Sequence, residues 1–348
     1  MTRVVSPQNI NEWTNLSTGI ELLPVRRSLA ANLGLFQPEF MEGKTFLLPV
    51  TSVNDYKMVD IPWGTRVKNT QRDNKARLPM TIPHFAIDDS VAPGDIQGKI
   101  AFDDFLLQSR SETVESFMDK KKEKARQTVM NTHNDAFMHL IKTGTAYSPS
   151  GTVINNYFTA FGVTQSVLNL DLTPTENPKT SIQAIIDNIT DNFEGGFVPT
   201  RRLALCGRNL FDALASHPFV LNSAAIYKED TMSVEMLTGI LGTQGFDLNA
   251  RYQAFSFGGV VWVRCDSEEE MPVGEARVFP TDLPDLFKIF FAPSDLTFDT
   301  INSPAQAEYY FELARANRTG VDFSYESNFL VGTLWPKAIV KVVAVYGV

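Results

Sequence analysis

The stretch that decides the fold begins TFLLPVTSVNDYKMVDIPWGTRVKNTQRDNKARLPM at residues 45–80 and continues TIPHFAIDDSVAPGDIQGKIAFDDF at residues 81–105. Prolines punctuate it, and strand patterns lie on both sides of a charged centre, which predicts an extended β-hairpin loop. Residues 77–87 alternate in the manner of a half-buried edge strand, and we expect Asp88 and Asp89 to end it. Because the segment lacks an apolar run large enough to form its own core, it needs another surface to cover it.

A long amphipathic helix is predicted immediately afterwards, over residues 108–142. The stretch contains no glycine or proline, and its apolar residues recur at spacings of three, four and seven. At 1.5 Å per residue such a helix is about 50 Å long. This length and the extended loop together describe an elongated subunit that reaches its neighbours, rather than a compact monomeric enzyme. The apolar residues of the helix are Val114, Phe117, Met118, Ala125, Val129, Ala136, Phe137, Leu140 and Ile141.

Composition limits the possible classes of function but does not identify one. The 348 residues are 43% hydrophobic, which is enough for a substantial core, and the net charge of −9 argues against a dedicated nucleic-acid binder. Cys206 and Cys265 lie far apart in the sequence, so we expect neither a disulfide framework nor a zinc site. The chain has no apolar signal core and no run of 18 apolar residues, so we expect synthesis in a reducing cytoplasm and no membrane span.

The rest of the chain alternates between predicted strands and helices. Residues 1–44 resemble an arm with scattered apolar residues, and residues 306–328 favour a hairpin. An α/β pattern follows a domain boundary predicted near residues 171–178. We expect strands at 152–163, 202–206, 257–265, 275–279, 286–292 and 338–346, and helices at 179–194, 208–216 and 233–241.

The order of these parts resembles a known family. The arm, the loop with IPHFAIDDSVAPGDI, the helix with EKARQTVMNTHNDAFMHLIKTG, the α/β insert and the closing ESNFLVGTLWPKAIVKVVAV are similar to the phage major capsid protein E family, the lambda type. The resemblance implies the α+β Hong Kong 97-type capsid fold. Its expected parts are an N-terminal arm at 1–44, an extended loop at 45–98, a peripheral domain at 99–176 and 303–348 built on the spine helix 108–142, and an axial domain at 177–302.

The resemblance also implies a function and a set of partners. Members of the family assemble as hexamers and pentamers into the icosahedral head of a tailed phage, which encloses double-stranded DNA. Subunits would exchange contacts and the spine helix would bend when a procapsid expands. The expected partners are further copies of the chain, a separate scaffolding protein, a portal, a decoration protein and packaged DNA bound without sequence-specific contact. The expected location is the virion, after assembly in the cytoplasm of a bacterial host.

Signatures of catalysis are absent from the sequence. It contains no G-x-S-x-G, H-E-x-x-H, G-x-G-x-x-G or Walker-type loop, and we expect no catalytic residue, cofactor or metal. The acidic pairs at 88–89 and 103–104 are interpreted as turn and capping residues rather than as acid–base pairs. His133 and His139 lie six residues apart on the long helix, which does not bring them to one face, so both are interpreted as surface or interface residues. His84 and His217 are interpreted as structural.

Two groups of basic residues are candidates for contacts. In the first, residues 120–126 interleave with Glu115, Asp119 and Glu123, which favours i,i+4 ion pairs on the helix over a contact with packaged DNA. The basic residues of this helix run are Lys120, Lys121, Lys122, Lys124 and Arg126. The second group lies toward the centre of the predicted loop and consists of Arg66, Lys68, Arg72, Lys75 and Arg77.

An acidic stretch, DSEEEMPVGE at residues 266–275, complements the second group in charge. We hypothesise that the basic tip of the loop docks on an acidic surface of a neighbouring subunit, including Glu268, Glu269 and Glu270. A solvated tip without a partner is the alternative. For the whole chain, the rival interpretations are a tail or neck component of a phage, an α/β enzyme, and the shell protein of a cellular nanocompartment.

Overall fold

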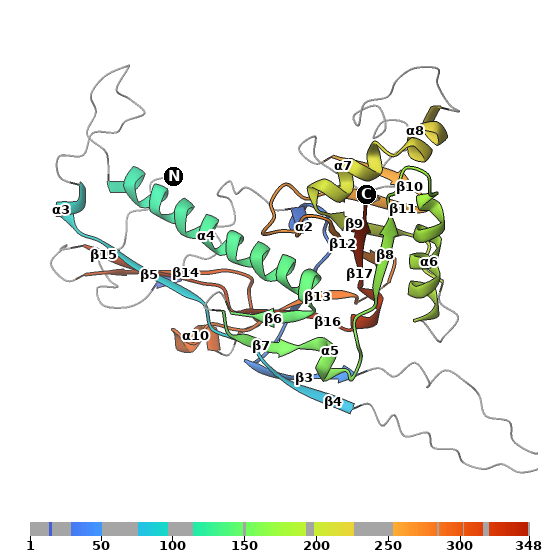
Figure 1. Ribbon diagram of the computed structural model, residues 1–348. Helices are drawn as coiled ribbons and strands as arrows, with labels where there is room; N and C mark the ends of the chain where they lie inside the picture. Colours follow the sequence, from blue (N-terminus) through green and yellow to red (C-terminus); the bar gives the residue numbers. More distant parts are fainter. Residues whose placement is uncertain are drawn as a thin grey trace, which may run out of the picture.

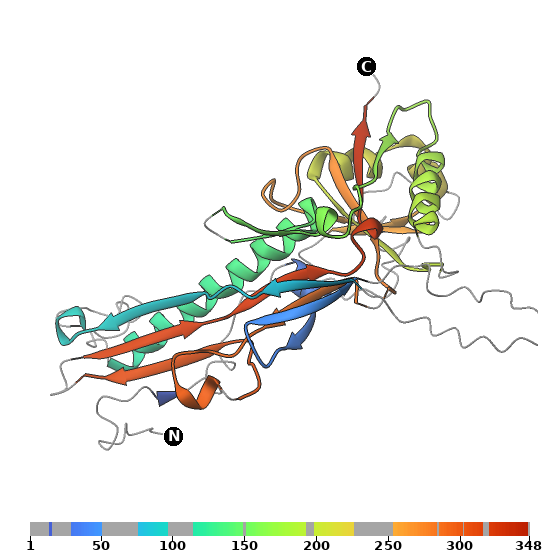
Figure 2. The ribbon, with the colours of Figure 1, turned by 90° about the horizontal axis from the view of Figure 1, so that it is seen from below.

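The computed structural model describes residues 14–15, 29–50, 76–96, 114–148, 151–192, 198–225, 253–283, 285–301, 303–315 and 320–346 (Figure 1). Helices and strands are both present, and the strands form two large sheets and three small ones. An elongated part carries the longest helix, and a second part holds the larger sheet with its helices (Figure 2). The predicted helix at 233–241 lies outside the described residues.

The long helix, α4, runs from Val114 to Thr143 over 30 residues, and the predicted start at residue 108 lies outside the described residues. It lies along a four-stranded antiparallel sheet of order β1-β14-β15-β5, as both views show. Met118, Ala125 and Val129 are buried against aromatic residues of this sheet, as their helical spacing predicts. The strands of the sheet are β1 (Thr14–Asn15), β5 (Ala86–Val91), β14 (Tyr309–Ala314) and β15 (Val321–Glu326).

β14 and β15 confirm the hairpin predicted over residues 306–328. The single strand predicted at 77–87 was wrong, because β4 (Ala76–Thr81) ends before Pro83 and a new strand, β5, begins at Ala86. Asp88 and Asp89 therefore lie within β5 and do not end a strand. Their charges are tolerated because β5 is the edge of its sheet, where both side chains are exposed.

The larger sheet is six-stranded and mixed, with the order β10-β11-β9-β12-β17-β8. β9 lies near its centre, and Leu203, Ala204 and Leu205 are fully buried, which explains why a short continuous apolar run forms a strand here. The helix α6 (Pro178–Asp191) begins where the sequence predicts, because Asn177 accepts a hydrogen bond from the Lys179 amide at its N-terminus. The strands are β8 (Val167–Asp171), β9 (Arg202–Cys206), β10 (Ala254–Phe257), β11 (Val260–Arg264), β12 (Glu275–Pro280) and β17 (Val340–Val345).

Two strand predictions in this region needed correction. The strand predicted at 257–265 is the end of β10 and the whole of β11, because Gly258 and Gly259 both have positive φ angles and form a two-residue hairpin turn. The strand predicted at 152–163 stops at Asn156, whose side chain accepts a hydrogen bond from the Thr159 amide and caps the short helix α5. The ends of these strands are thus set by turn and cap residues. The two short elements concerned are β7 (Val153–Asn156) and α5 (Tyr157–Ala160).

A three-stranded sheet brings a strand from the N-terminal part of the chain next to two strands from its C-terminal quarter. In it β13 pairs with β16 in antiparallel and with β2 in parallel orientation. The end of the predicted arm therefore packs into the body of its own subunit: Leu29 is fully buried, and the Phe36 ring stacks on Phe137 of α4 at 4.0 Å. These elements are α2 (Leu29–Asn32), β2 (Gln37–Phe40), β13 (Phe287–Phe291) and β16 (Phe329–Thr333).

The predicted extended loop is described at its base, where β3 and β4 pair in antiparallel orientation. Leu48 and Met80 are buried on one face of this hairpin, whereas Leu47 and its cross-strand neighbour Pro79 are exposed on the other. The remaining short elements are β3 (Thr45–Val50), α3 (Pro93–Ile96), β6 (Thr145–Tyr147), which pairs with β7, α7 (Arg208–Ala215), α8 (Pro218–Ala225), α10 (Phe298–Ile301) and the 3₁₀ helix η4 (Pro336–Ala338).

The sheets do not follow the domain boundaries that the resemblance implied. β8 and β17 come from the ranges expected for the peripheral domain, yet they pair within the sheet whose other strands come from the axial range. β5, within the range expected for the loop, belongs to the sheet under α4. The division into an arm, a loop and two domains therefore stays a prediction, with sheet pairing that crosses several of its boundaries.

Candidate assembly surfaces

The acidic stretch at 266–275 forms the connection between β11 and β12. The chain turns within it, since the Met271 amide donates to the Ser267 carbonyl at 3.1 Å, and Met271 itself is buried. The side chains of Glu268 and Glu269 are exposed, and Glu270 is partly buried. Among the residues that the structure describes, no ion pair includes Glu268 or Glu269, so their charges are available to a partner.

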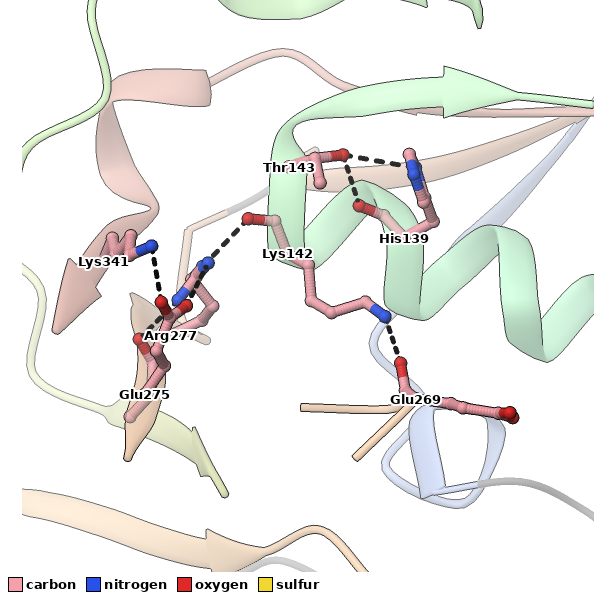
Figure 3. Close-up of polar contacts among 8 residues, drawn as sticks. His139, Lys142, Thr143, Glu269, Glu275, Arg277 and Lys341 are labelled. Carbon is pink, nitrogen blue, oxygen red and sulfur yellow. Dashed lines mark hydrogen bonds and ion pairs between the residues drawn. The ribbon is translucent and has the colours of Figure 1, made fainter. Parts of the chain in front are cut away.

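This acidic connection is attached to the C-terminal end of α4 (Figure 3). The Lys142 ammonium donates a hydrogen bond to the Glu269 backbone carbonyl, and the Glu269 carboxylate is directed away from Lys142. Burial lowers the pKa of Lys142, and the charge of Asp135 partly offsets this effect. Because the backbone rather than the carboxylate is held, the attachment fixes the connection without neutralising its acidic side chains.

Arg277 completes the junction between α4 and the six-stranded sheet (Figure 3). Its Nε donates to the Lys142 carbonyl at 2.9 Å, which satisfies one of the carbonyls left without a helical partner at the end of α4. The residue is only 4% exposed, and its guanidinium lies 3.1 Å from Glu275 Oε2. The Lys341 ammonium lies 2.7 Å from Glu275 Oε1, so the Glu275 carboxylate forms ion pairs with both Arg277 and Lys341.

The pKa shifts within this junction follow from burial and pairing. Burial lowers the pKa of Arg277, although Glu275 opposes the shift. Burial alone would raise the pKa of Glu275, but hydrogen bonds from Lys341 and Arg277 bring it below its ordinary value. The junction is therefore ionic at neutral pH and rigidly connected, and it positions the acidic connection relative to the long helix.

Most of the predicted basic tip, namely Arg66, Lys68, Arg72 and Lys75, lies outside the described residues. Arg77 is described, on β4 at the base of the hairpin, where it is exposed opposite Pro49. Within the described ranges no carboxylate of this subunit pairs with Arg77. The tip and the acidic connection are thus not brought together by the described part of one chain, and their docking stays a prediction about neighbouring subunits.

Part of the basic run on α4 has a role that the sequence did not predict. Three of its five basic side chains pair with the sheet below the helix: Lys121 lies 2.6 Å from Asp89 and Lys122 lies 2.7 Å from Glu312. Arg126 lies 3.1 Å from Glu308, which also accepts a hydrogen bond from the Tyr325 hydroxyl. Sequence spacing carried no sign of these partners, because β5 and β14 are remote in the chain. These three side chains fasten α4 to its sheet.

The histidine predictions were correct for one residue and wrong for another. His217 is buried and structural, with its Nε2 3.1 Å from the Thr173 carbonyl. His133 is not a surface residue: it is 7% exposed, its Nε2 lies 2.9 Å from the Ser327 hydroxyl, and it packs edge-on against Phe329. Its position on the apolar stripe of α4, four residues before Phe137, is the signal that could have placed it. Burial lowers the pKa of His133 to about 4.

Other kinds of site find little support in the described residues. No group of three or more metal-ligating side chains gathers there. Nor does any described helix have the length and apolar character needed to cross a membrane. Cys206 and Cys265 are both free and buried.

Several apolar side chains remain exposed on the described surface. Phe298 of α10 stands out, because 91% of its side chain is exposed. Contiguous apolar patches commonly mark surfaces that a partner covers, whereas single exposed apolar residues are ordinary, so Phe298 is notable for the extent of its exposure. No pattern in the sequence distinguished Phe298 from a core residue. The other large members of this set are Phe40, Leu47, Val153, Val167, Val198, Phe219, Val273, Ile301, Val345 and Tyr346.

The combination of a long helix on a narrow sheet, a hairpin and a second sheet is the Hong Kong 97-type capsid fold. A putative capsid protein of an E. coli CFT073 prophage matches it with a TM-score of 0.53 at 10% identity, over 95% of this chain and 100% of that chain. The cyanophage Pam1 capsid protein matches with a TM-score of 0.50 at 10% identity, over 98% of both chains. At this identity the similarity establishes the fold alone.

The sequence places the chain in a family. It belongs to the phage major capsid protein E family, whose model matches residues 12–344. The major capsid protein of Pseudomonas phage KPP10 is 30% identical over 357 residues, which cover 98% of this chain and 99% of the relative. This chain is therefore a phage major capsid protein, a structural component of the virion and not an enzyme. The expected family, fold class and type of function are confirmed, and the rival interpretations are set aside.

Proposed function

We propose that this chain assembles as hexamers and pentamers into the icosahedral head of a tailed phage around double-stranded DNA, within the cytoplasm of its bacterial host. A separate scaffolding protein, a portal and a decoration protein are the proposed partners, and packaged DNA is contacted without reading its sequence. Membership of the capsid family carries this proposal. The net charge of −9 supports the absence of a dedicated DNA-binding surface.

The proposed contact between neighbours is electrostatic. The basic tip, consisting of Arg66, Lys68, Arg72, Lys75 and Arg77, docks on the acidic connection that carries Glu268, Glu269 and Glu270 of the next subunit. The position of that connection supports this contact, because Lys142 holds its backbone while the Glu268 and Glu269 carboxylates remain exposed. Opposite charges on two surfaces speed the encounter of the two subunits and help to fix the register in which they bind. Many such modest contacts, repeated around a ring, add up through multivalency.

Charge reversal on each side tests this contact. Arg66, Lys68 and Arg72 are changed together to Glu, and in a second variant Glu268 and Glu269 are changed to Lys. Each variant is expected to fold but to reduce the yield of closed particles by at least tenfold, because like charges then face each other. The combined five-site variant is expected to recover most of the yield.

The measurement is particle yield by sedimentation and electron microscopy, with thermal unfolding of soluble subunits as the check on folding. A matched control reverses Asp191, an exposed acid on α6, to Lys. Normal particles from both reversed variants, or a combined variant no better than either one, would remove the docking proposal. Wild-type particles that are rings or tubes rather than closed shells would contradict the proposed head.

A further inference from the structure

The most exposed large apolar side chain of the described surface is held by a short, hydrogen-bonded turn. Phe298 begins α10, and the next residue, Asp299, is also exposed. The turn is fixed from below, because Thr300 is buried and its hydroxyl donates to the Thr297 carbonyl at 2.9 Å. The Ser303 hydroxyl in turn donates to the Thr300 carbonyl at 2.9 Å. Phe298 is therefore a fixed apolar projection, and we call Phe298 and Asp299 together the α10 knob.

A shallow cavity of about 260 Å³ lies elsewhere on the subunit, between the end of the arm and the connection from β12 to β13. It is smaller than the roughly 300–1,000 Å³ of pockets that hold drug-sized ligands, so a single aromatic side chain is a better match for it. Its walls are mixed: apolar side chains line part of it, and the polar residues Gln37, Arg201, Thr281 and Asp282 line the rest. The apolar lining residues are Leu33, Leu35, Phe279, Leu283, Leu286 and Phe287.

The rim carries a charge opposite to that of the knob. Arg201 is exposed, and across the described residues no ion pair includes either Arg201 or Asp299. The nearby Asp282 carboxylate already accepts hydrogen bonds from the Thr200 amide at 2.6 Å and the Thr200 hydroxyl at 2.8 Å. The Arg201 guanidinium is thus the rim group left for an incoming acid, beside a cavity that apolar side chains line in part.

One subunit cannot use its own knob to fill its own cavity. Phe287 lines the cavity at the start of β13, and α10 follows the end of that strand. The extended backbone of β13 separates its two ends by about 13 Å, at roughly 3.3 Å per residue. In Figure 1 the helix α2, next to the cavity, lies above β13 and α10 lies below it. A knob and a hole at separate places on the same chain define a head-to-tail contact, which forms a ring when the rotation between successive copies closes.

We propose that Phe298 of one subunit inserts into this cavity of a neighbouring copy, with Asp299 facing Arg201 at the rim. The occupant is a second copy of this chain because a capsid protein is surrounded by copies of itself, because the apolar side chains of the cavity can contact an aromatic ring, and because Asp299 and Arg201 carry opposite charges. Aromatic side chains that fill pockets commonly carry much of the binding energy of an interface, and complementary charges help to fix its register. The contact rests on the proposed assembly into rings, and it is independent of the basic tip.

A charge exchange tests the pairing. Asp299→Arg alone and Arg201→Asp alone are each expected to lower particle yield at least tenfold, and the double variant is expected to return it to within threefold of wild type. Phe298→Ala should lower the yield as strongly, whereas Phe298→Leu should retain part of it. The matched control is Asp191→Arg on α6, with thermal unfolding to show that every variant folds.

A disulfide test supplies a second readout. Phe298→Cys combined with Gln37→Cys on the cavity rim should produce covalently linked chains in oxidised particles, while Phe298→Cys with Thr180→Cys on α6 should not. Links at the first pair together with rescue in the charge exchange support the proposal. Single variants that assemble like wild type, or an exchange that restores nothing, overturn it. A wild-type chain that forms no rings or shells would instead contradict the proposed function, so the two failures are distinguishable.

Discussion

At the scale of single residues, the clearest result concerns titratable groups that the fold has buried. His133 lies between α4 and the strands beneath it, next to Ser327 and Phe329. Arg126 and Glu308 form a largely buried pair in the same layer. Groups of this type make the contact between α4 and its sheet sensitive to pH and to single substitutions, because an unpaired charge in a buried position is costly.

His133 is expected to make the subunit less stable in acid. Its pKa is about 4 in the folded chain, against 6.5 for an unperturbed histidine. Since the folded value is the lower one, the stabilising contribution is complete above about pH 6.5 and is lost as the pH falls toward 4. Between pH 7.5 and pH 4.5 the loss attributable to this residue is about 2–3 kcal/mol.

Urea unfolding of wild type and His133→Gln at these two pH values measures the loss. Glutamine keeps a polar group near Ser327 but does not titrate, so the free energy of unfolding of the variant should fall less in acid than that of wild type. Because the other titrating groups are the same in both proteins, the difference between them isolates His133. Identical losses in the two proteins would show that His133 is not responsible.

At the scale of elements, boundaries are set by particular residues rather than by the periodicity of the segments. The long helix ends at Thr143 because Gly144 has a φ of +66°, in the left-handed region that glycine occupies readily. The Gly144 amide still donates to the Leu140 carbonyl at 2.7 Å, which closes the last turn. A β-carbon at this position would lie 2.1 Å from the ring of Phe158, so α5 packs directly against the helix end.

Gly144→Ala is therefore expected to destabilise the subunit by about 3 kcal/mol or more, from backbone strain and overpacking together. Gly162→Ala is a matched control, because Gly162 has a φ of +63° and an added β-carbon there would meet no atom within 4 Å. That variant should lose only about 1–2 kcal/mol. Thermal unfolding of both variants gives the comparison. Equal losses would mean that contact with Phe158 contributes nothing.

At the scale of the whole molecule, two bodies meet at the end of α4. The four-stranded sheet lies beneath most of the helix, and the six-stranded sheet begins beyond it, with Arg277 of β12 joining that sheet to the end of α4 (Figures 1 and 3). The same junction positions the acidic connection that we propose as a docking surface. The contact between α4 and the six-stranded sheet therefore depends in part on one buried guanidinium.

Arg277→Ala is expected to cost about 3–5 kcal/mol, because it leaves the Lys142 carbonyl without its side-chain donor and removes one of two cations from Glu275. Arg315→Ala is the matched control: Arg315 also pairs with a carboxylate, that of Asp322, but on the surface, where such pairs are worth about 0–1 kcal/mol. Urea unfolding measures both losses. If the two variants lose equal stability, the contacts of Arg277 contribute no more than a surface ion pair, and its proposed role at the junction is contradicted.

The local sequence pattern predicted an element correctly wherever that element depends on a single segment of the chain. The apolar spacing of α4, the run RLALC of β9, the capped start of α6 and the β14–β15 hairpin are all visible in sequence, because each depends on residues close together in the chain. The family resemblance supplied the fold class and the function. The strand ends at Asn156 and Gly258 were missed, since one cap or turn residue overrides a longer apolar pattern.

Contacts between segments that are distant in the sequence are visible only in the folded structure. The order of residues was enough to establish a long amphipathic helix, a hairpin, an α/β region and the character of a capsid subunit. It was not enough to show that Lys121 and Lys122 pair with the sheet, that His133 is buried, or that Arg277 caps α4. Periodicity fixes the face on which a side chain lies, but the partner of that face depends on strands as much as two hundred residues away.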